Sequence, residues 1–269
     1  MLLHRHPGFW NGQRKPTGVQ AGYTFDPSGR LSNGLLMGIV ADGPIGTGMM
    51  IDIRRPRTWT VGGTGTPIFA SGQYGRQFQG GVTGLDQLTF APTIADPGSV
   101  FSVSTMVLCD GSAHGGFNYV LLGAAAVGTE FCMASGANSS WQCGNLVVGV
   151  ASSVITMAAL SGWHRLGLTC NGTAVRYFLD GKFTDAVTLG GAVSNGNPST
   201  LTGGLTAGNS SFQWPVADFF FWGRTLSDAD MATHWAQPYR SVMTARFGEL
   251  GGSPGVSPYV PAGMVILCG

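Results

Sequence analysis

The sequence predicts an all-β fold, an antiparallel β-sandwich. Glycine supplies 44 of the 269 residues, more than twice its average share of about 7%. Lysine and glutamate, which favour helices, each occur only twice, so strands and turns are favoured over helices. Hydrophobic residues make up 43% of the chain, which is enough for a sizeable core.

The segment from Ser161 to Lys182 has the clearest strand pattern. Apolar side chains occupy every second position on both sides of a turn: Leu166, Leu168 and Cys170 before it, and Val175, Tyr177 and Leu179 after it. This period of two puts one set of side chains on each face of a sheet. We expect Asn171-Gly172 to form the two-residue hairpin turn and Asp180-Gly181 to turn the chain again.

The remaining elements are also mostly strands. Alternating or apolar runs bounded by Gly, Pro, Asn or Asp predict strands at 34–41, 48–53, 58–61, 68–70, 75–80, 86–90, 101–109, 119–124, 129–134, 145–150, 153–157, 186–189, 205–207 and 216–222. One short helix is predicted near 228–236. Ser227 is a suitable N-cap, the acidic Asp228 and Asp230 suit the positive end of the helix, and Pro238 follows its end.

Two stretches resemble a known family. The hairpin SGWHRLGLTCNGTAVRYFLDGK is similar to the core hairpin of laminin-G-like (concanavalin-A-like) jelly-roll domains, as found in tailed-bacteriophage structural proteins. The most specific match follows the family's C-terminal pattern in order: Asp218, Arg224, Leu226, Ser227, Trp235 and Pro238. The resemblance covers about residues 30–240. It implies a jelly-roll domain at 31–240, an irregular N-terminal arm at 1–30 and a Gly/Pro-rich tail at 241–269.

The resemblance implies a non-enzymatic virion structural protein, either a capsid decoration protein or a tail or fibre component. Its partners would be other virion proteins and further copies of itself in a homo-oligomer. The charged fraction of 10%, against about 25% in ordinary soluble domains, agrees with a surface covered by partners. It agrees equally with a sandwich that has many uncharged turns.

Five residues are candidates for subunit contacts. Phe9 and Trp10 are apolar anchors in the arm, and Arg54, Arg55 and Arg57 stand where the family has small polar residues. The alternative for the arginines is a solvated loop. The first ten residues contain no long apolar run, so we expect assembly in the host cytoplasm and localisation in the virion. The net charge of +1 predicts neither a nucleic-acid nor a membrane partner.

Catalysis is not expected. Jelly-roll glycosidases use two neighbouring carboxylates, whereas the two glutamates of this chain, Glu130 and Glu249, are far apart in the sequence. The alternative function is a lectin-like module for cell-surface glycans. Trp141 with Asn138, and Trp214 with Asn209, lie in Asn/Ser-rich segments suited to stacking and hydrogen-bonding a sugar. The other interpretation is that both tryptophans cover the ends of the sandwich.

No cofactor is expected apart from the structural calcium ion that the resemblance suggests. Asp218 matches the family's aspartate, and Asp42 is a second candidate ligand. The alternative role for Asp218 is a hydrogen bond that fixes the last strand. Cys132 and Cys143 bracket a Gly/Asn/Ser segment and are either a disulfide pair or, as we prefer, buried thiols.

Overall fold

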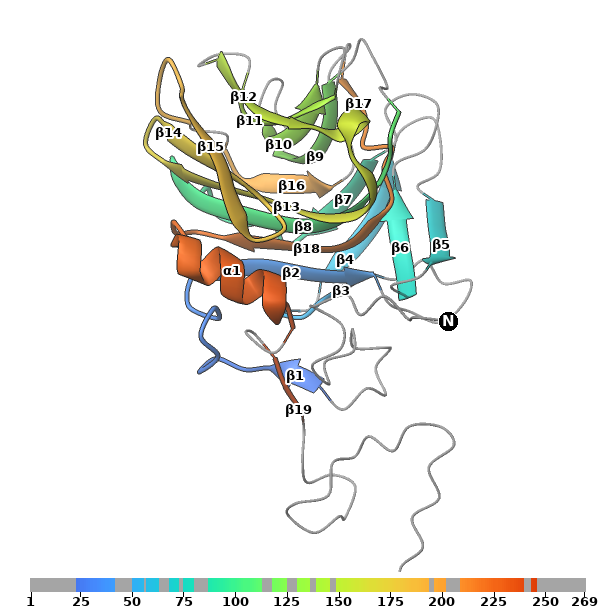
Figure 1. The fold of residues 1–269 in the computed structure, drawn as a ribbon. Helices are drawn as coiled ribbons and strands as arrows, with labels where there is room; N and C mark the ends of the chain where they lie inside the picture. The colour runs from blue at the N-terminus through green and yellow to red at the C-terminus, as the bar shows by residue number, and fades with distance from the viewer. Residues whose placement is uncertain are drawn as a thin grey trace, which may run out of the picture.

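The computed structural model describes residues 23–41, 50–55, 57–62, 68–72, 75–79, 87–112, 118–124, 130–135, 139–145, 149–193, 196–201, 209–239 and 243–245. Two sheets face each other as a β-sandwich, and every strand pair within these ranges except one is antiparallel (Figure 1). This confirms the predicted fold class. No helix in the described ranges is long and apolar enough to cross a membrane.

The first sheet, here called the helix-side sheet, is built around the predicted hairpin. In spatial order its strands are β15 (Lys182–Thr188), β14 (Ala174–Leu179), β13 (Ser161–Asn171), β8 (Val100–Asp110), β18 (Val216–Trp222), β2 (Leu35–Ala41) and β3 (Met50–Asp52), with β6 (Gly75–Gln79) pairing with β18 and with β5 (Ile68–Gly72).

The second sheet, here called the far sheet, covers the other side of the core. Its strands are β12 (Gly149–Thr156), β11 (Ser140–Asn145), β10 (Glu130–Ser135), β9 (Asn118–Ala124), β16 (Pro198–Leu201), β7 (Gln87–Ala91) and β4 (Thr58–Gly62), with β17 (Asn209–Ser211) parallel to β9. A single 3₁₀ turn, Met157–Ala159, links β12 to β13.

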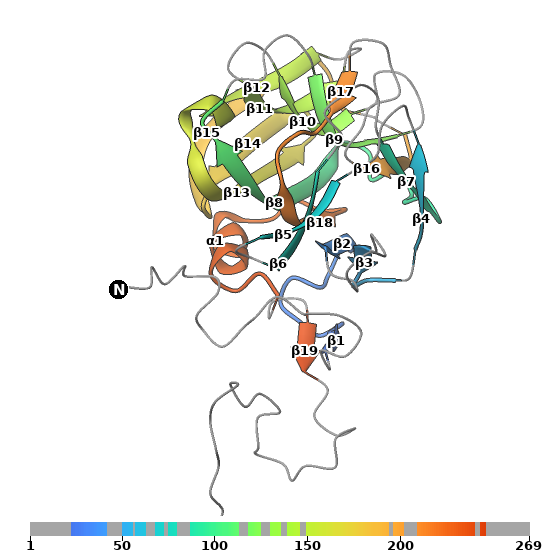
Figure 2. The same ribbon diagram turned by 90° about the vertical axis from the view of Figure 1, so that its right-hand side faces the viewer.

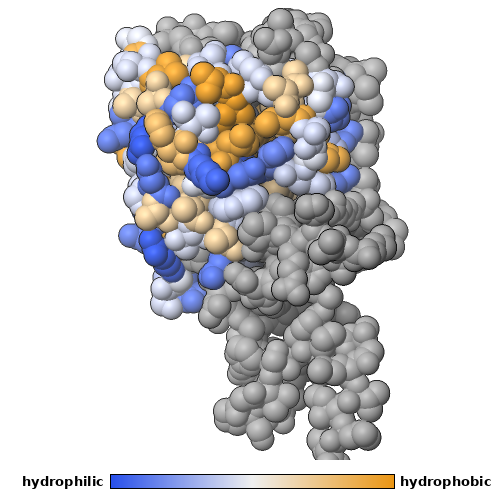
Figure 3. Space-filling view, viewed as in Figure 1, coloured by the Kyte–Doolittle hydropathy of each residue, from blue (hydrophilic) through white to orange (hydrophobic). Residues whose placement is uncertain are grey.

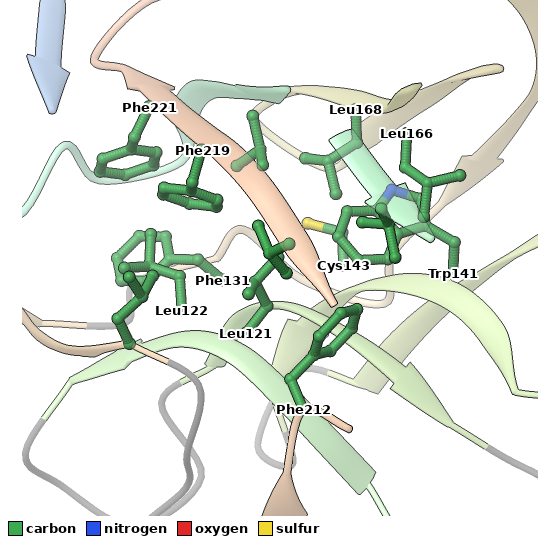
Figure 4. Close-up of a cluster of buried hydrophobic side chains, with 14 of the residues drawn as sticks. Leu121, Leu122, Phe131, Trp141, Cys143, Leu166, Leu168, Phe212, Phe219 and Phe221 are labelled. Carbon is green, nitrogen blue, oxygen red and sulfur yellow. The ribbon is translucent and has the colours of Figure 1, made fainter. Parts of the chain in front are cut away.

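The core fills the space between the two sheets. Figure 4 shows Phe219 and Phe221 of β18 facing Leu121, Leu122 and Phe131 of the far sheet. The rings of Phe131 and Phe221 meet edge to face, with centroids 5.4 Å apart. Each such side chain, fully buried, stabilises the fold by about 1.5–3 kcal/mol.

The hairpin forms as predicted, but its turn is shifted by one residue. Asn171 pairs with Ala174, so the two turn residues are Gly172 and Thr173 rather than Asn171 and Gly172. Gly172 has a φ of +69°, which glycine adopts without strain. The next turn follows the prediction, because Asp180 (φ +51°) and Gly181 (φ +75°) lie between paired Leu179 and Lys182.

The predicted helix is α1 (Asp228–Ala236), which lies on the outer side of the helix-side sheet (Figure 1). Ser227 caps it, and its hydroxyl accepts a hydrogen bond from the Asp230 amide, while the Asp230 carboxylate accepts one from the Ser227 amide. Beneath the helix lies a second apolar cluster that comprises Leu31, Leu35, Phe178, Phe220, Trp222, Leu226, Met231 and Tyr239.

A two-stranded ribbon joins the predicted arm and tail. β1 (Tyr23–Phe25) pairs antiparallel with β19 (Met243–Ala245). The ribbon lies beyond β2 and β3, outside both sheets (Figures 1 and 2). Phe25 packs against the apolar cluster beneath α1. Both the predicted arm and the predicted tail therefore contain a short strand. β1 is anchored because Phe25 packs on the outer face of the domain. The boundaries at residues 30 and 240 remain predictions.

Candidate functional site

The two tryptophans predicted to stack on sugars are interior residues. Trp141 lies in β11 with no exposed surface, and Trp214 is 1% exposed. Both pack around Phe212, at centroid distances of 6.4 and 5.2 Å. The prediction of surface stacking is therefore wrong for both. Their Asn/Ser-rich neighbours indicated exposed loops, whereas the two tryptophan side chains point into the core. Asn138 lies outside the described residues, and for Asn209 only the backbone, in β17, is described.

Asp218 is an internal ion-pair partner, not a calcium ligand. Arg165 donates two hydrogen bonds to it, at 3.0 and 2.7 Å, and the Tyr239 hydroxyl donates a third at 2.8 Å. The backbone amide of Met106 donates a fourth at 3.2 Å. A carboxylate has about four acceptor positions, so none remains for a cation. The alternative role, fixing the last strand, is the correct one.

Within the described residues, no group of three His, Cys, Asp or Glu side chains could hold a metal ion. Asp42, the second calcium candidate, lies outside those residues.

The ion pair of Arg165 and Asp218 also fixes α1 to the sheet. His234 of α1 is fully buried, and its Nε2 accepts a hydrogen bond from Arg165 at 3.3 Å. Burial, together with the charge of Arg165, holds the pKa of His234 well below its usual value, so the imidazole is neutral. The network therefore joins β13, β18 and α1.

The arginine triplet is mostly used within the domain. Arg57 forms a salt bridge of 2.5 Å with Asp52, and neither side chain has exposed surface. Its prediction as a subunit contact is therefore wrong, because the guanidinium neutralises a buried carboxylate. Arg54 and Arg55 are exposed. They also donate to the backbone carbonyls of Leu35 (3.3 Å) and Thr93 (3.0 Å), so a partner contact there remains a prediction. Phe9 and Trp10 lie outside the described residues.

Cys143 is a buried thiol, as are Cys109 and Cys170. The alternative in which Cys143 pairs with Cys132 as a disulfide is therefore wrong, and Cys143 on β11 packs in the core instead.

A pair of partly exposed tryptophans offers a better binding surface. Trp163 of β13 and Trp235 of α1 both pack against buried Met106 and Ala217 on the outer side of the helix-side sheet. Ala217 faces this side because the pairing of β18 with β8 is shifted between Val216 and Asp218. We call Trp163 and Trp235, with the two residues beneath them, the tryptophan surface.

A histidine–aspartate pair joins β13 to the Asp180–Gly181 turn. His164 Nδ1 lies 2.9 Å from Asp180 Oδ2, and the two side chains are 22% and 29% exposed. The hydrogen bond to Asp180 raises the pKa of His164, against the smaller opposing effect of burial. Asp180 Oδ1 accepts a further bond from the Arg165 amide at 2.9 Å. The turn and the strand are therefore joined through one carboxylate.

Gly181 brings this turn against the helix. A Cβ atom on Gly181 would lie 2.5 Å from the Cβ of Trp235, closer than real contacts allow. Only glycine permits both this approach and the positive φ of the turn. The Asp180–Gly181 turn and the C-terminal end of α1 are thus held against each other.

Trp163 and Trp235 were not among the binding residues predicted from the sequence. The signal for Trp163 is present in the strand pattern, because Leu166 and Leu168 face the core and odd-numbered positions face outward. Trp235 gives no comparable signal, since its position depends on where α1 lies on the sheet.

No family model matches this chain, and no curated protein matches it. Solved structures do. The binding domain of Paraclostridial Mosquitocidal Protein 1 superposes with a TM-score of 0.55 at 10% identity, over 76% of this chain and 52% of that one. The binding domain of botulinum neurotoxin DC, solved in complex with SialylT, gives 0.53 at 11% identity, over 76% and 51%.

A shorter domain matches over nearly its whole length. Domain 4 of AbnA, a GH43 extracellular arabinanase from Geobacillus stearothermophilus solved in complex with arabinotriose, has a TM-score of 0.51 at 15% identity, over 76% of this chain and 98% of that one. This chain spans about half the length of the two toxin binding domains. At these identities the similarity shows the fold, a β-sandwich shared with domains solved as binding domains.

Proposed function

We propose that this chain is a non-enzymatic binding domain that recognises a carbohydrate on the tryptophan surface. The observation that carries the proposal is that two partly exposed indoles, Trp163 and Trp235, pack against the same buried pair, Met106 and Ala217. The similarity to domains solved with arabinotriose and with SialylT supports it.

The chemistry of the surface suits a sugar ring. A pyranose or furanose has an apolar C–H face and a rim of hydroxyl groups, and an indole presents a flat apolar face. Asp180 is 29% exposed and comes directly before Gly181, which packs against Trp235, so its carboxylate can accept hydrogen bonds from hydroxyls at the rim. A few polar groups beside aromatic side chains are the usual composition of a small-ligand site.

The binding experiment compares the intact chain with variants of the surface. Isothermal titration with arabinotriose, and an array of neutral and acidic oligosaccharides, test for binding. Trp163→Ala and Trp235→Ala are expected to weaken binding at least tenfold while the circular dichroism spectrum stays the same. Val154→Ala changes a side chain that is 68% exposed on β12 and serves as the control. Equal binding by all four proteins, or no glycan binding at all, contradicts the proposal.

A second function is favoured by the β1–β19 ribbon. The pairing of Tyr23 with Ala245 brings the arm and tail segments together at one place beside the helix-side sheet. We propose for this role a bacteriophage virion component that contacts copies of itself and other virion proteins through that region and through Arg54 and Arg55.

Size-exclusion chromatography with light scattering tests this second role. The full chain is expected to form a homo-oligomer, and a chain that begins at residue 31, and therefore lacks β1, is expected to be monomeric. Mass spectrometry of purified particles would then be expected to detect the protein in the virion. A monomer in both cases contradicts the role.

A further inference from the structure

A second group of exposed side chains lies beyond the turn that carries Gly181. Phe183 of β15 is 47% exposed. The guanidinium of Arg176, on β14, lies over its ring at 4.6 Å. Arg176 also forms a two-point ion pair with Asp228 of α1, at 2.6 and 3.0 Å. The tryptophan surface does not include any of these residues.

Arg176 is fixed in position but still has donors to offer. Its guanidinium stacks on Phe178 (5.6 Å) as well as on Phe183. Among the described residues it donates only to Asp228, which uses part of its set of five N–H groups. The side chains of Arg176 and Asp228 are 41% and 53% exposed. Donors and an acceptor therefore lie side by side next to an exposed ring.

This group and the tryptophan surface flank the same structural unit. Gly181 packs directly against Trp235, and Phe183 follows two positions later in the chain. Along α1, Asp228 is in the first turn and Trp235 in the last, a separation of about 10 Å at the usual helical rise. Figure 3 shows mixed hydrophilic and hydrophobic surface around α1 and β15. The most hydrophobic surface in that view gathers higher, around β10–β12.

We propose that Phe183, Arg176 and Asp228 form a second subsite, so that the domain binds a neutral oligosaccharide chain rather than a single sugar. This inference rests on the proposed carbohydrate-binding function. Phe183 packs against the apolar face of one sugar unit while Trp163 and Trp235 hold another. Arg176 donates to one hydroxyl, and Asp228 accepts from its neighbour.

The ion pair selects against acidic sugars. Arg176 and Asp228 are neutral as a pair, and together they match the donor and acceptor properties of adjacent hydroxyl groups. A ligand carboxylate on the remaining donors of Arg176 would lie next to the Asp228 carboxylate and would be repelled by it at close range. Neutral chains are therefore the expected ligands.

The test measures affinity against chain length on the full chain. The probes are arabino-oligosaccharides of increasing length and an array of neutral and acidic oligosaccharides. Phe183→Ala and Arg176→Ala are expected to weaken binding of the longer neutral oligosaccharides about tenfold and to leave the shortest bound ligand unaffected. Asp228→Asn is expected to raise binding of acidic relative to neutral oligosaccharides. Val154→Ala is the control.

The outcomes separate the two proposals. If Trp163→Ala and Trp235→Ala weaken binding but Phe183→Ala and Arg176→Ala do not, the second subsite is overturned and the proposed function stands. Equal losses for short and long ligands also overturn the second subsite. A preference of the unaltered protein for acidic oligosaccharides overturns the neutral ligand class. No binding to any oligosaccharide overturns both proposals.

Discussion

Arg165 and Asp218 form a two-point ion pair that lies across strand β8, with side chains only 3% and 1% exposed. Arg165 also donates to the Ser104 hydroxyl of β8 at 3.2 Å. Three neighbouring strands are thereby joined on the face that α1 covers. A buried pair of this kind contributes little net stability compared with apolar residues, but removal of one partner leaves a buried charge.

Loss of one member of this pair is expected to be severe. Arg165→Met should lower the free energy of unfolding by about 3–5 kcal/mol, because Asp218 is left charged and buried. Arg176→Met breaks an exposed pair with similar geometry and should cost no more than about 1 kcal/mol. Urea denaturation measures both. Equal costs for the two variants would show that burial does not determine the effect.

His164 is expected to make stability decline as pH rises above about 6.5. The pKa of His164 in the folded chain is raised by its bond to Asp180. The stability that protonated His164 contributes is therefore fully present below the unfolded-state pKa of about 6.5. It is lost as the pH rises through the higher pKa of the folded chain. The thermal unfolding midpoint of the parent protein should therefore decrease as the pH rises above about 6.5, and that of His164→Gln should decrease less. Parallel curves for the two proteins from pH 6 to 8.5 would contradict the assignment.

His234 is expected to act in the opposite pH range. Its pKa in the folded chain lies well below the ordinary value, because the imidazole is buried next to Arg165. Below pH about 6.5 the unfolded chain takes up a proton that the folded chain does not, so stability should decline as pH falls. Thermal unfolding from pH 7 to 4.5 measures this decline. His234→Gln should reduce it, and an unchanged slope in that variant would count against a neutral buried His234.

Gly181 connects stability to the proposed binding surface. Gly181→Ala places a methyl group against Trp235 at a positive φ, so it should both destabilise the protein and weaken glycan binding. Gly172→Ala is the matched control, since Gly172 has a similar φ but no atom within 4 Å of the place its new methyl group would occupy. It should show only the backbone cost of about 1–2 kcal/mol. Identical losses of stability and binding in both variants would rule out a packing role for Gly181.

The sequence predicted the elements that depend on local chemistry. The strand alternation around Leu166 and Tyr177, the Asp180–Gly181 turn and the Ser227 cap of α1 all agree with the structure. The first turn was misplaced by one residue, because Asn171 suits a turn as well as Gly172 does and cross-strand pairing decides between them.

The site was harder to predict, because exposure depends on tertiary packing. Trp141 and Trp214 have polar neighbours in the sequence, yet the sandwich closes over them. Arg57 was predicted to contact another subunit. Its actual partner, Asp52, is brought to it by the pairing of β2 with β3, and no local pattern in the sequence indicates that pairing. Trp235 reaches the surface only through the docking of α1, which no local pattern specifies.

The β1–β19 ribbon has a mechanical consequence. Tyr23 begins β1 and Ala245 ends β19, and they face each other, so the chain enters and leaves the ribbon at the same end. A force that pulls apart the segments before Tyr23 and after Ala245 would first act on the Tyr23–Ala245 pair. The following pairs, Thr24–Thr244 and Phe25–Met243, would then open one after the other. The force would be transmitted to the two large sheets only after the two strands of the ribbon had separated. The ribbon would therefore unfold before the sandwich under tension.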